Sequence, residues 1–241
     1  MSDGWHVVRE LPLSDILIVA DHASNRVPPG IDLGIDRALL TTHIGWDIGV
    51  AALAQALQAP SFLGNVSRLV IDLNRDPDDP DLVPLTSDGH DIPGNHGDTS
   101  DRLATFWHPY HDDLAARIEA VQPTLIVSLH SFTPQLSTSV GHGRPWEVGV
   151  LYNNDDRAAR IAIPLLEAAG IVTGDQQPYS GKLLNATMNR HGEGTGTPYL
   201  GLEVRQNLID HDEGVSEWAR RLRPVLQACL DAFDEEGTEV S

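Results

Sequence analysis

Short, strongly apolar runs separated by longer segments of helical period constrain the fold of this chain most. Five runs have the character of buried strands: residues 15–20 (DILIVA), 68–74 (RLVIDLN), 124–130 (TLIVSLH), 146–152 (WEVGVLY) and 198–204 (PYLGLEV). Runs of this length and apolarity are typical of strands in a parallel sheet that helices cover on both sides. The alternation therefore predicts a layered α/β fold around a mainly parallel sheet.

The segments between these runs have the apolar spacing of amphipathic helices. We expect helices over residues 44–59, 101–121, 155–169 and 215–233. Two long stretches, residues 76–100 and 179–197, are rich in turn-forming residues and are expected to be binding loops, lids or disordered segments. No repeat and no low-complexity linker divides the chain, so we expect a single domain over residues 1–241.

The charge of the chain excludes several classes of partner. Its 35 acidic and 16 basic residues give a formal net charge of -19, whereas nucleic acids and anionic lipid surfaces attract basic proteins. No apolar run approaches the ~20 residues of a membrane-spanning helix, and the opening MSDGWHVVRE lacks the layout of a secretory signal. The single cysteine, Cys229, excludes an intramolecular disulfide and is expected to be packed in the last helix. We therefore expect a cytoplasmic protein that binds neither nucleic acid nor a membrane.

Polar side chains follow four of the five apolar runs, at the point where each strand is expected to end. In chain order they are Asp21-His22, Asn74-Arg75, His130-Ser131, and Glu203 with Arg205. Open α/β sheets bind ligands outside the carboxyl ends of their strands, where several loops converge. These residues therefore predict one shared site at that edge of the sheet.

The two histidines at strand ends, His22 and His130, are candidate metal ligands. Catalytic zinc uses about three protein ligands and keeps an open position, and a mixed set of histidines and a carboxylate suits it. Asp47 in HIGWDIGV is our third candidate, because it is a lone carboxylate in the first turn of an otherwise apolar helix. The alternative for Asp47 is stabilisation of that helix through its dipole, and for each histidine it is a hydrogen-bonded place in the core.

Three further polar residues leave alternatives open. Asp21 could orient the His22 imidazole as a hydrogen-bond partner or could itself bind the metal. His108 and His111 in WHPYH have a spacing that can share a metal, although the proline between them favours packing or capping.

The segment SRLVIDLNR carries an arginine at each end of the second expected strand. One of the two arginines, Arg68 or Arg75, could polarise a carbonyl group while the other binds a carboxylate. Asp72 between them is expected to pair with a neighbouring arginine. The alternative is a surface ion-pair ladder, which the apolar flanks of the segment disfavour.

Glu203 is the candidate general base. A carboxylate beside a water molecule activated by a metal can remove its proton and then pass it to the leaving amine. The alternative is a structural contact with Arg205, which lies two residues along the strand and faces the same way. Arg144 in GHGRPW is a second candidate for binding a carboxylate.

Nine strings, in this order and across nearly the whole chain, resemble the N-formylglutamate amidohydrolase family: DHASNRVP, HIGWDIG, SRLVIDLNRDP, IPGN, PYH, LHSFTP, RPWEVGVL, PYS and LEVRQ. That family is similar in fold to zinc carboxypeptidases and aspartoacylases, which have a mixed sheet between helices. The resemblance therefore implies a zinc carboxypeptidase-like, three-layer α/β/α fold with a mixed, mostly parallel sheet. The resemblance implies a zinc ion at His22 and His130, with Glu203 as the catalytic glutamate. It further implies that Arg68 stabilises the oxyanion and that Asn74-Arg75 binds a substrate carboxylate.

The sequence departs from these relatives at two places. Zinc carboxypeptidases and aspartoacylases have His-x-x-Glu as a ligand pair, whereas this chain has His22 and Asn25, so the resemblance does not supply the third ligand and Asp47 is a hypothesis for it. The HSFTP stretch at residues 130–134 does not resemble the branch of the family that serves histidine degradation.

The expected function is zinc-dependent hydrolysis of a small anionic N-acyl amino acid, such as N-formylglutamate, to formate and glutamate. The alternatives are a carboxypeptidase-like zinc hydrolase acting on another N-acyl amino acid or a cell-wall-type amide, and a binding module without metal. The sequence does not specify the oligomeric state.

Overall fold

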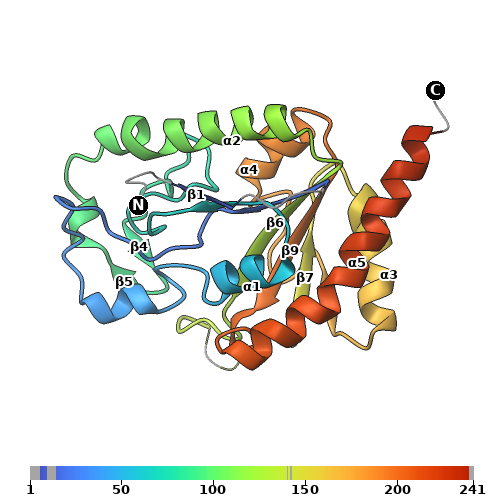
Figure 1. Cartoon of the computed structure of the whole chain (residues 1–241). Coiled ribbons are helices and arrows are strands. Elements are labelled where there is room, and N and C mark those ends of the chain that lie inside the picture. Colours follow the sequence, from blue (N-terminus) through green and yellow to red (C-terminus); the bar gives the residue numbers. More distant parts are fainter. Residues whose placement is uncertain (1–5, 10–14, 140, 142, 239–241) are drawn as a thin grey trace.

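The computed structural model of the chain describes residues 6–9, 15–139, 141 and 143–238. Within these residues seven strands form one mixed sheet in the order β1-β3-β2-β6-β9-β7-β8 (Figure 1). The strands are β1 (His6–Arg9), β2 (Ile16–Ala20), β3 (Ser61–Gly64), β6 (Leu125–Phe132), β7 (Val148–Leu151), β8 (Thr173–Asp175) and β9 (Tyr199–Arg205). Neighbouring strands run parallel except where β1 meets β3 and where β7 meets β9.

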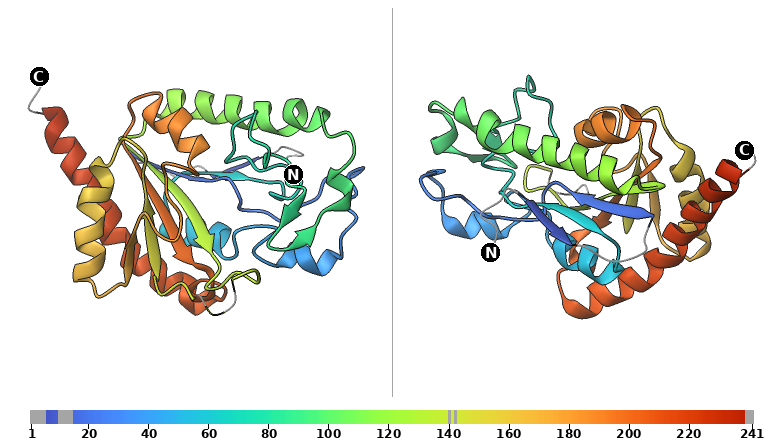
Figure 2. Two further views of the ribbon diagram at one scale, coloured as in Figure 1. Left: turned by 180° about the vertical axis from the view of Figure 1, so that it is seen from behind. Right: turned by 45° about the horizontal axis from the view of Figure 1, so that its top comes forward.

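Helices cover both faces of this sheet (Figures 1 and 2). On one face lie α2 (His108–Val121) and the short α4 (Ala186–Met188), and on the other lie α1 (Val50–Leu57), α3 (Arg157–Ala168) and α5 (Asp212–Thr238). Both α1 and α3 pack against α5. The prediction of a three-layer α/β/α fold with a mixed, mostly parallel sheet is confirmed.

The inner strands are apolar because both of their faces are covered. All five residues of β2 and all eight residues of β6 are buried. A polar side chain in such a strand is costly to bury unless it has a partner. In β6, the polar residues His130 and Ser131 lie near the carboxyl end of the strand. The apolar runs that predicted β2, β6, β7 and β9 therefore reflect the position of these strands inside the sheet.

Short elements complete the fold. Residues 76–100 contain a hairpin of β4 (Thr86–Ser87) and β5 (His90–Asp91), followed by a single 3-10 turn, Pro93–Asn95. Residues 179–197 contain α4 and a π-helical turn, Asn189–Glu193. The remaining turns are the 3-10 helices Arg37–Thr41 and Gln206–Leu208 and the π-helical turn Leu103–Trp107, which leads directly into α2.

The predicted strand over residues 68–74 is wrong. The segment is buried but irregular, because side chains rather than a neighbouring strand bind its backbone carbonyl groups. Asn95 Nδ2 donates to Leu69 O at 2.8 Å, and Arg102 Nη1 donates to Val70 O at 2.7 Å. Buried backbone groups need partners but not strand partners, so an apolar run alone does not distinguish the two cases.

Three expectations concern the cysteine, membrane-spanning helices and the opening segment. Cys229 is buried in α5, and burial raises the pKa of its thiol to about 12, as a packed cysteine requires. Across the described ranges, every helix is too short or too polar to cross a bilayer. The opening MSDGWHVVRE lies outside the described residues except for His6–Arg9.

Candidate active site

The strand register brings distant polar residues to one edge of the sheet. β6 and β9 run parallel with His130 opposite Glu203. β2 and β6 pair with Val19 opposite Ser128, so the residues two positions further along each strand, Asp21 and His130, come side by side. The carboxyl ends of these three strands therefore meet, as the polar residues after the apolar runs predicted.

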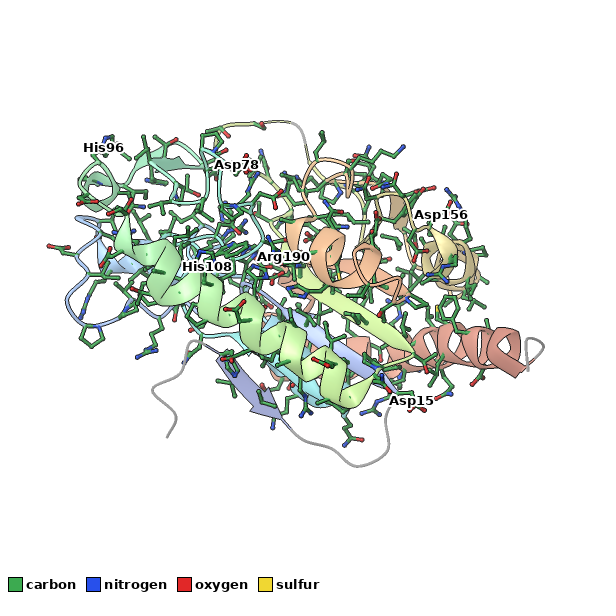
Figure 3. All side chains as sticks on the ribbon, turned by 90° about the horizontal axis from the view of Figure 1, so that it is seen from above. Asp15, Asp78, His96, His108, Asp156 and Arg190 are labelled. Atoms are coloured by element: carbon green, nitrogen blue, oxygen red, sulfur yellow. The ribbon has the colours of Figure 1, made fainter. Side chains whose placement is uncertain are left out.

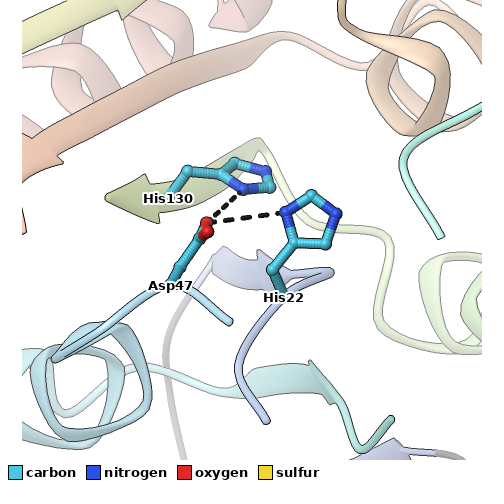
Figure 4. Close-up of side chains that lie close together, drawn as sticks. All are labelled: His22, Asp47 and His130. Carbon is cyan, nitrogen blue, oxygen red and sulfur yellow. Dashed lines mark hydrogen bonds and ion pairs between the residues drawn. The ribbon is translucent and has the colours of Figure 1, made fainter. Parts of the chain in front are cut away.

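His22, Asp47 and His130 form a buried cluster at this edge (Figure 4). One ligand atom from each residue lies within 4.8 Å of the others. Asp47 Oδ2 is 2.9 Å from His130 Nδ1 and 3.6 Å from His22 Nδ1. His22 Nδ1 is buried and has no hydrogen-bond partner among the described residues. Such an atom is costly to bury unless a bound group, such as a cation, accepts the lone pair of the nitrogen. Two imidazoles and a carboxylate in this arrangement can hold a divalent cation such as zinc.

The loop before α1 holds Asp47 at the cluster. The Asp47 backbone N–H donates to His22 O at 2.9 Å, and the Ser131 N–H donates to Asp47 Oδ2 at 3.3 Å. Gly49 ends the loop with a φ of 84°, and a Cβ there would lie 2.1 Å from Ile209 O, so glycine is required. Asp47 thus precedes α1, and the expectation that it lies in the first turn of a helix starting at residue 44 is wrong.

A different aspartate contacts the second ring nitrogen of each histidine. His22 Nε2 is 2.6 Å from Asp72 Oδ1, and His130 Nε2 is 3.3 Å from Asp21 Oδ2. When the Nε2 atoms carry the protons, the Nδ1 atoms of both rings present lone pairs to the cluster. Asp21 therefore faces His130 rather than His22, and Asp72 occupies the position beside His22 that the sequence had offered to Asp21.

Carboxylates outnumber the guanidinium groups in this cluster. Asp21, Asp47 and Asp72 are all buried. Arg68 bridges two of them, at 3.3 Å from Asp47 Oδ1 and 3.0 Å from Asp72 Oδ2. Burial opposes ionisation, but the charge of His22 and its neighbours holds the pKa of both Asp47 and Asp72 below the usual range. The excess negative charge is what a divalent cation would balance when the imidazoles are neutral.

A cavity of about 220 Å³ opens beside the cluster. It is lined by the strand ends and the loops around them: His22, His43, Asp47, Arg68, Asp72, Asn74, Arg75, His130, Ser131, Phe132, Thr133, Tyr179, Leu184 and Glu203. Removal from bulk water raises the pKa of Glu203 to about 7, against the opposing charge of His130. A carboxyl group with such a pKa can both accept and return a proton near neutral pH. Arg205, the alternative partner of Glu203, instead donates to Asn207 Oδ1 at 3.0 Å.

Asn74 and Arg75 line this cavity in the irregular segment that replaces the predicted strand. Arg75 Nη1 is 3.2 Å from Asp79 Oδ2, and its Nε is 3.8 Å from Asp72 Oδ2. These two carboxylates fix the guanidinium group while leaving it at the cavity wall. The expected pairing of Asp72 with neighbouring arginines is therefore present, with both Arg68 and Arg75.

Arg144 is not among the described residues that line this cavity. Its Nη1 atom donates to Tyr179 OH at 2.9 Å, and its guanidinium lies 4.8 Å from the centre of the Tyr179 ring. Tyr179 itself lines the cavity, so Arg144 reaches the site through this side chain. Tyr179 and His43 had no spacing signal in the sequence, because each comes from a loop whose path depends on contacts with other segments.

His108 and His111 do not meet at a shared site. His108 is exposed near the start of α2, which lies across the sheet when viewed from above (Figure 3). His111 is buried, and its Nδ1 atom is 2.9 Å from His191 Nε2. The expectation of packing agrees with the buried position of His111 but not with His108, whose side chain is exposed.

Comparison with known proteins shows where the chain has relatives. The N-formylglutamate amidohydrolase family model matches residues 14–210. A solved gene product of Agrobacterium tumefaciens has a TM-score of 0.86 at 28% identity, over 95% of this chain and 96% of that one. The structure of N-formylglutamate amidohydrolase from Ralstonia eutropha JMP134 has a TM-score of 0.67 at 16% identity, over 95% and 97%, and shares the fold. No curated protein matches the sequence.

Proposed function

This chain belongs to the N-formylglutamate amidohydrolase family, and we propose that it is a zinc-dependent enzyme that cleaves the amide of a small N-acyl acidic amino acid. With N-formylglutamate as substrate, the products are formate and glutamate. The observation that carries the proposal is the meeting of His22, Asp47 and His130 in the cavity that also contains Glu203. We take residues 1–241 as one catalytic domain that acts in the cytoplasm on a small anionic substrate.

We assign the zinc ligands to the Nδ1 atoms of His22 and His130 and to a carboxylate oxygen of Asp47. The buried Nδ1 atom of His22 without a partner among the described residues, and the excess of carboxylates around it, support this assignment. A zinc ion held there would act as a Lewis acid, which polarises an amide carbonyl and makes a water molecule more acidic.

Glu203 moves the proton in this proposal. Its carboxylate takes a proton from the attacking water and delivers it to the nitrogen of the leaving amine as the C–N bond breaks. Burial raises the pKa of Glu203, which makes its carboxylate a stronger proton acceptor than an exposed glutamate. Positioned proton transfer of this kind contributes roughly 10²–10⁴-fold to a rate.

The arginines supply positive charge at fixed places. Arg68 is held by two aspartates, and 31% of its side chain is exposed where it lines the cavity, so it is the group that stabilises negative charge on the carbonyl oxygen. Asn74 and Arg75 bind the substrate carboxylate. Because Arg144 lies behind Tyr179, we assign it to holding that ring rather than to direct contact with substrate.

A longer N-acylated substrate is the second candidate. A second cavity of about 390 Å³ shares five lining residues with the first: His43, Arg68, Asp72, Arg75 and Tyr179. Its other walls carry hydroxyl and apolar side chains and two aspartates, Asp81 and Asp88, which suit an uncharged or basic extension such as a further amide-linked residue. This space favours a substrate larger than N-formylglutamate, for example a cell-wall-type amide.

Metal analysis combined with a substrate panel tests the proposal. We expect one zinc ion per chain and hydrolysis of N-formylglutamate that a chelator abolishes and added zinc restores. Faster hydrolysis of N-formyl dipeptides or N-acetyl substrates would favour the second candidate. Ligand binding without zinc and without turnover would instead indicate a binding module.

The Glu203→Gln variant tests the role of the glutamate. It should retain stoichiometric zinc while kcat falls by about 10²–10⁴-fold, because the amide cannot accept the proton. Glu217→Gln makes the same chemical change on the exposed face of α5 and should leave kcat unchanged. A fully active Glu203→Gln enzyme would remove Glu203 from the mechanism.

A further inference from the structure

Thr187 lies where two parts of the candidate active site meet. It belongs to α4, far along the chain from the strand ends, and is fully buried. Its hydroxyl group donates to Asp21 Oδ1 at 2.9 Å, while its backbone N–H donates to Asn74 Oδ1 at 3.0 Å. One residue therefore contacts both the aspartate that faces His130 and the amide side chain that lines the cavity.

The Asp21 carboxylate uses its two oxygens for different partners. Oδ1 accepts hydrogen bonds from Thr187 Oγ1 at 2.9 Å and Tyr110 OH at 2.8 Å. Oδ2 makes an ion-pair contact with His130 Nε2 at 3.3 Å that lacks hydrogen-bond geometry. Two donors on Oδ1 fix the plane of the carboxylate, and Oδ2 is thereby aimed at the imidazole. Since Asp21, Tyr110 and Thr187 are all buried, a lost hydroxyl group would leave Oδ1 short of a partner.

The backbone N–H of Thr187 determines which way the Asn74 amide faces. An N–H can only donate, so the Asn74 atom 3.0 Å from it must be the carbonyl oxygen Oδ1. The Nδ2 group of Asn74 is then the donor available at the cavity wall. A donor at this position suits an acceptor such as a substrate carboxylate, whereas the opposite orientation would repel it.

We propose that Thr187 is a positioning residue with two separable effects on the site, an inference that rests on the proposed function. Through its hydroxyl group it holds Asp21, which holds His130 Nε2, so that His130 presents Nδ1 toward Asp47 and the metal. Through its backbone N–H it holds Asn74 in the orientation that receives the substrate carboxylate. Because different groups of Thr187 carry the two effects, one substitution can separate them.

Thr187→Val is the decisive variant, because it removes the hydroxyl group and keeps the side-chain shape and the backbone N–H. We expect its zinc dissociation constant, measured by competition with a chromogenic chelator, to rise by about 10–100-fold. The KM of the zinc-saturated variant should stay at the wild-type value. Thr187→Ser restores a hydroxyl group and should restore wild-type zinc affinity.

Two other variants test the separation of the effects. Tyr110→Phe removes the second hydroxyl donor to Asp21 Oδ1 and should also weaken zinc binding, which carries the test if Thr187→Val does not fold. Asn74→Ala should raise KM and leave zinc affinity unchanged. Thermal melting of the metal-free proteins shows whether packing is retained in each variant.

The possible results distinguish this inference from the function on which it rests. Wild-type zinc affinity in both Thr187→Val and Tyr110→Phe, whatever their melting temperatures, would overturn the role of Thr187 while the proposed function stands. Failure of Thr187→Ser to recover zinc affinity would overturn it as well. A wild-type protein that binds no zinc would reject the role of Thr187 together with the zinc-dependent function.

Discussion

The buried pair of His111 and His191 should make the protein unstable in mild acid. His111 Nε2 is 3.0 Å from Leu73 O, so this nitrogen carries the proton and donates to the carbonyl group. His111 Nδ1 is then a lone pair that accepts from His191 Nε2–H at 2.9 Å. A proton added to His111 Nδ1 would place two N–H groups against each other and remove this hydrogen bond.

The magnitude follows from the pKa values of the two rings. Burial lowers the pKa of both His111 and His191 from 6.5 to about 4, and for His191 the neighbouring His111 adds to the effect. Below pH 6.5 the unfolded chain therefore binds protons that the folded protein does not bind until about pH 4. Stability is full above this window and is lost as the pH falls through it. At about pH 5, each histidine lowers the free energy of unfolding by ~2 kcal/mol, a large share of the roughly 5–15 kcal/mol of a typical protein.

Equilibrium urea unfolding of the wild type and of His191→Gln, both treated with a chelator, measures this effect. Glutamine at this position offers an amide donor to His111 Nδ1 but does not titrate. Above about pH 6.5 the unfolding free energies of the two proteins should run parallel, and at about pH 5 the wild type should have lost ~2 kcal/mol more than the variant. Other titrating groups, including those of the metal cluster, are common to both proteins and cancel in the comparison. An equal loss in both proteins would refute the assignment of acid sensitivity to this pair.

Two further substitutions test how the metal cluster is built. Asp47→Asn should raise the zinc dissociation constant by more than about 100-fold, because an amide is a poor zinc ligand. Asp79→Asn is the control and should retain zinc. Wild-type zinc affinity in Asp47→Asn would exclude Asp47 as a ligand. Gly49→Ala should lower the free energy of unfolding by more than ~1 kcal/mol, since its Cβ would lie 2.1 Å from Ile209 O. Gly30 is the control, because it has a similar φ of 89° but no atom lies within 4 Å of the position of an added Cβ. Urea unfolding measures both alanine variants. An equal loss of unfolding free energy in Gly49→Ala and Gly30→Ala would show that the contact with Ile209 O does not matter.

The positions of the polar residues at strand ends could be predicted from the sequence. His22, His130 and Glu203 follow long apolar runs, and parallel strands of one sheet bring their carboxyl ends to one edge. Asp47 stood out because an isolated carboxylate in an apolar segment needs a partner. Its actual place, before α1 and beside Ser131, depends on a loop conformation that no local pattern specifies.

The contacts that orient the histidines could not be predicted. Asp72 contacts His22 from a segment whose apolar composition predicted a strand. An apolar run indicates that a segment is buried, but it does not indicate which groups bind its backbone or its polar side chains. Thr187 contacts Asp21 across 166 residues of sequence. Strand β3 was missed for a related reason, since its four residues are too few to show a period.

The irregular buried segment at residues 68–75 limits how the loop that follows it can be replaced, because side chains of that loop bind the backbone of the segment. Asn95, which lies in the long excursion between β3 and α2, donates not only to Leu69 O but also to Pro84 O at 2.8 Å. A replacement of residues 76–100 that has no amide side chain at position 95 would leave the carbonyl oxygens of Leu69 and Pro84 without this donor. Transplants of this region should therefore carry Asn95 with them, together with Arg102, whose Nη1 binds Asn95 Oδ1 at 2.7 Å.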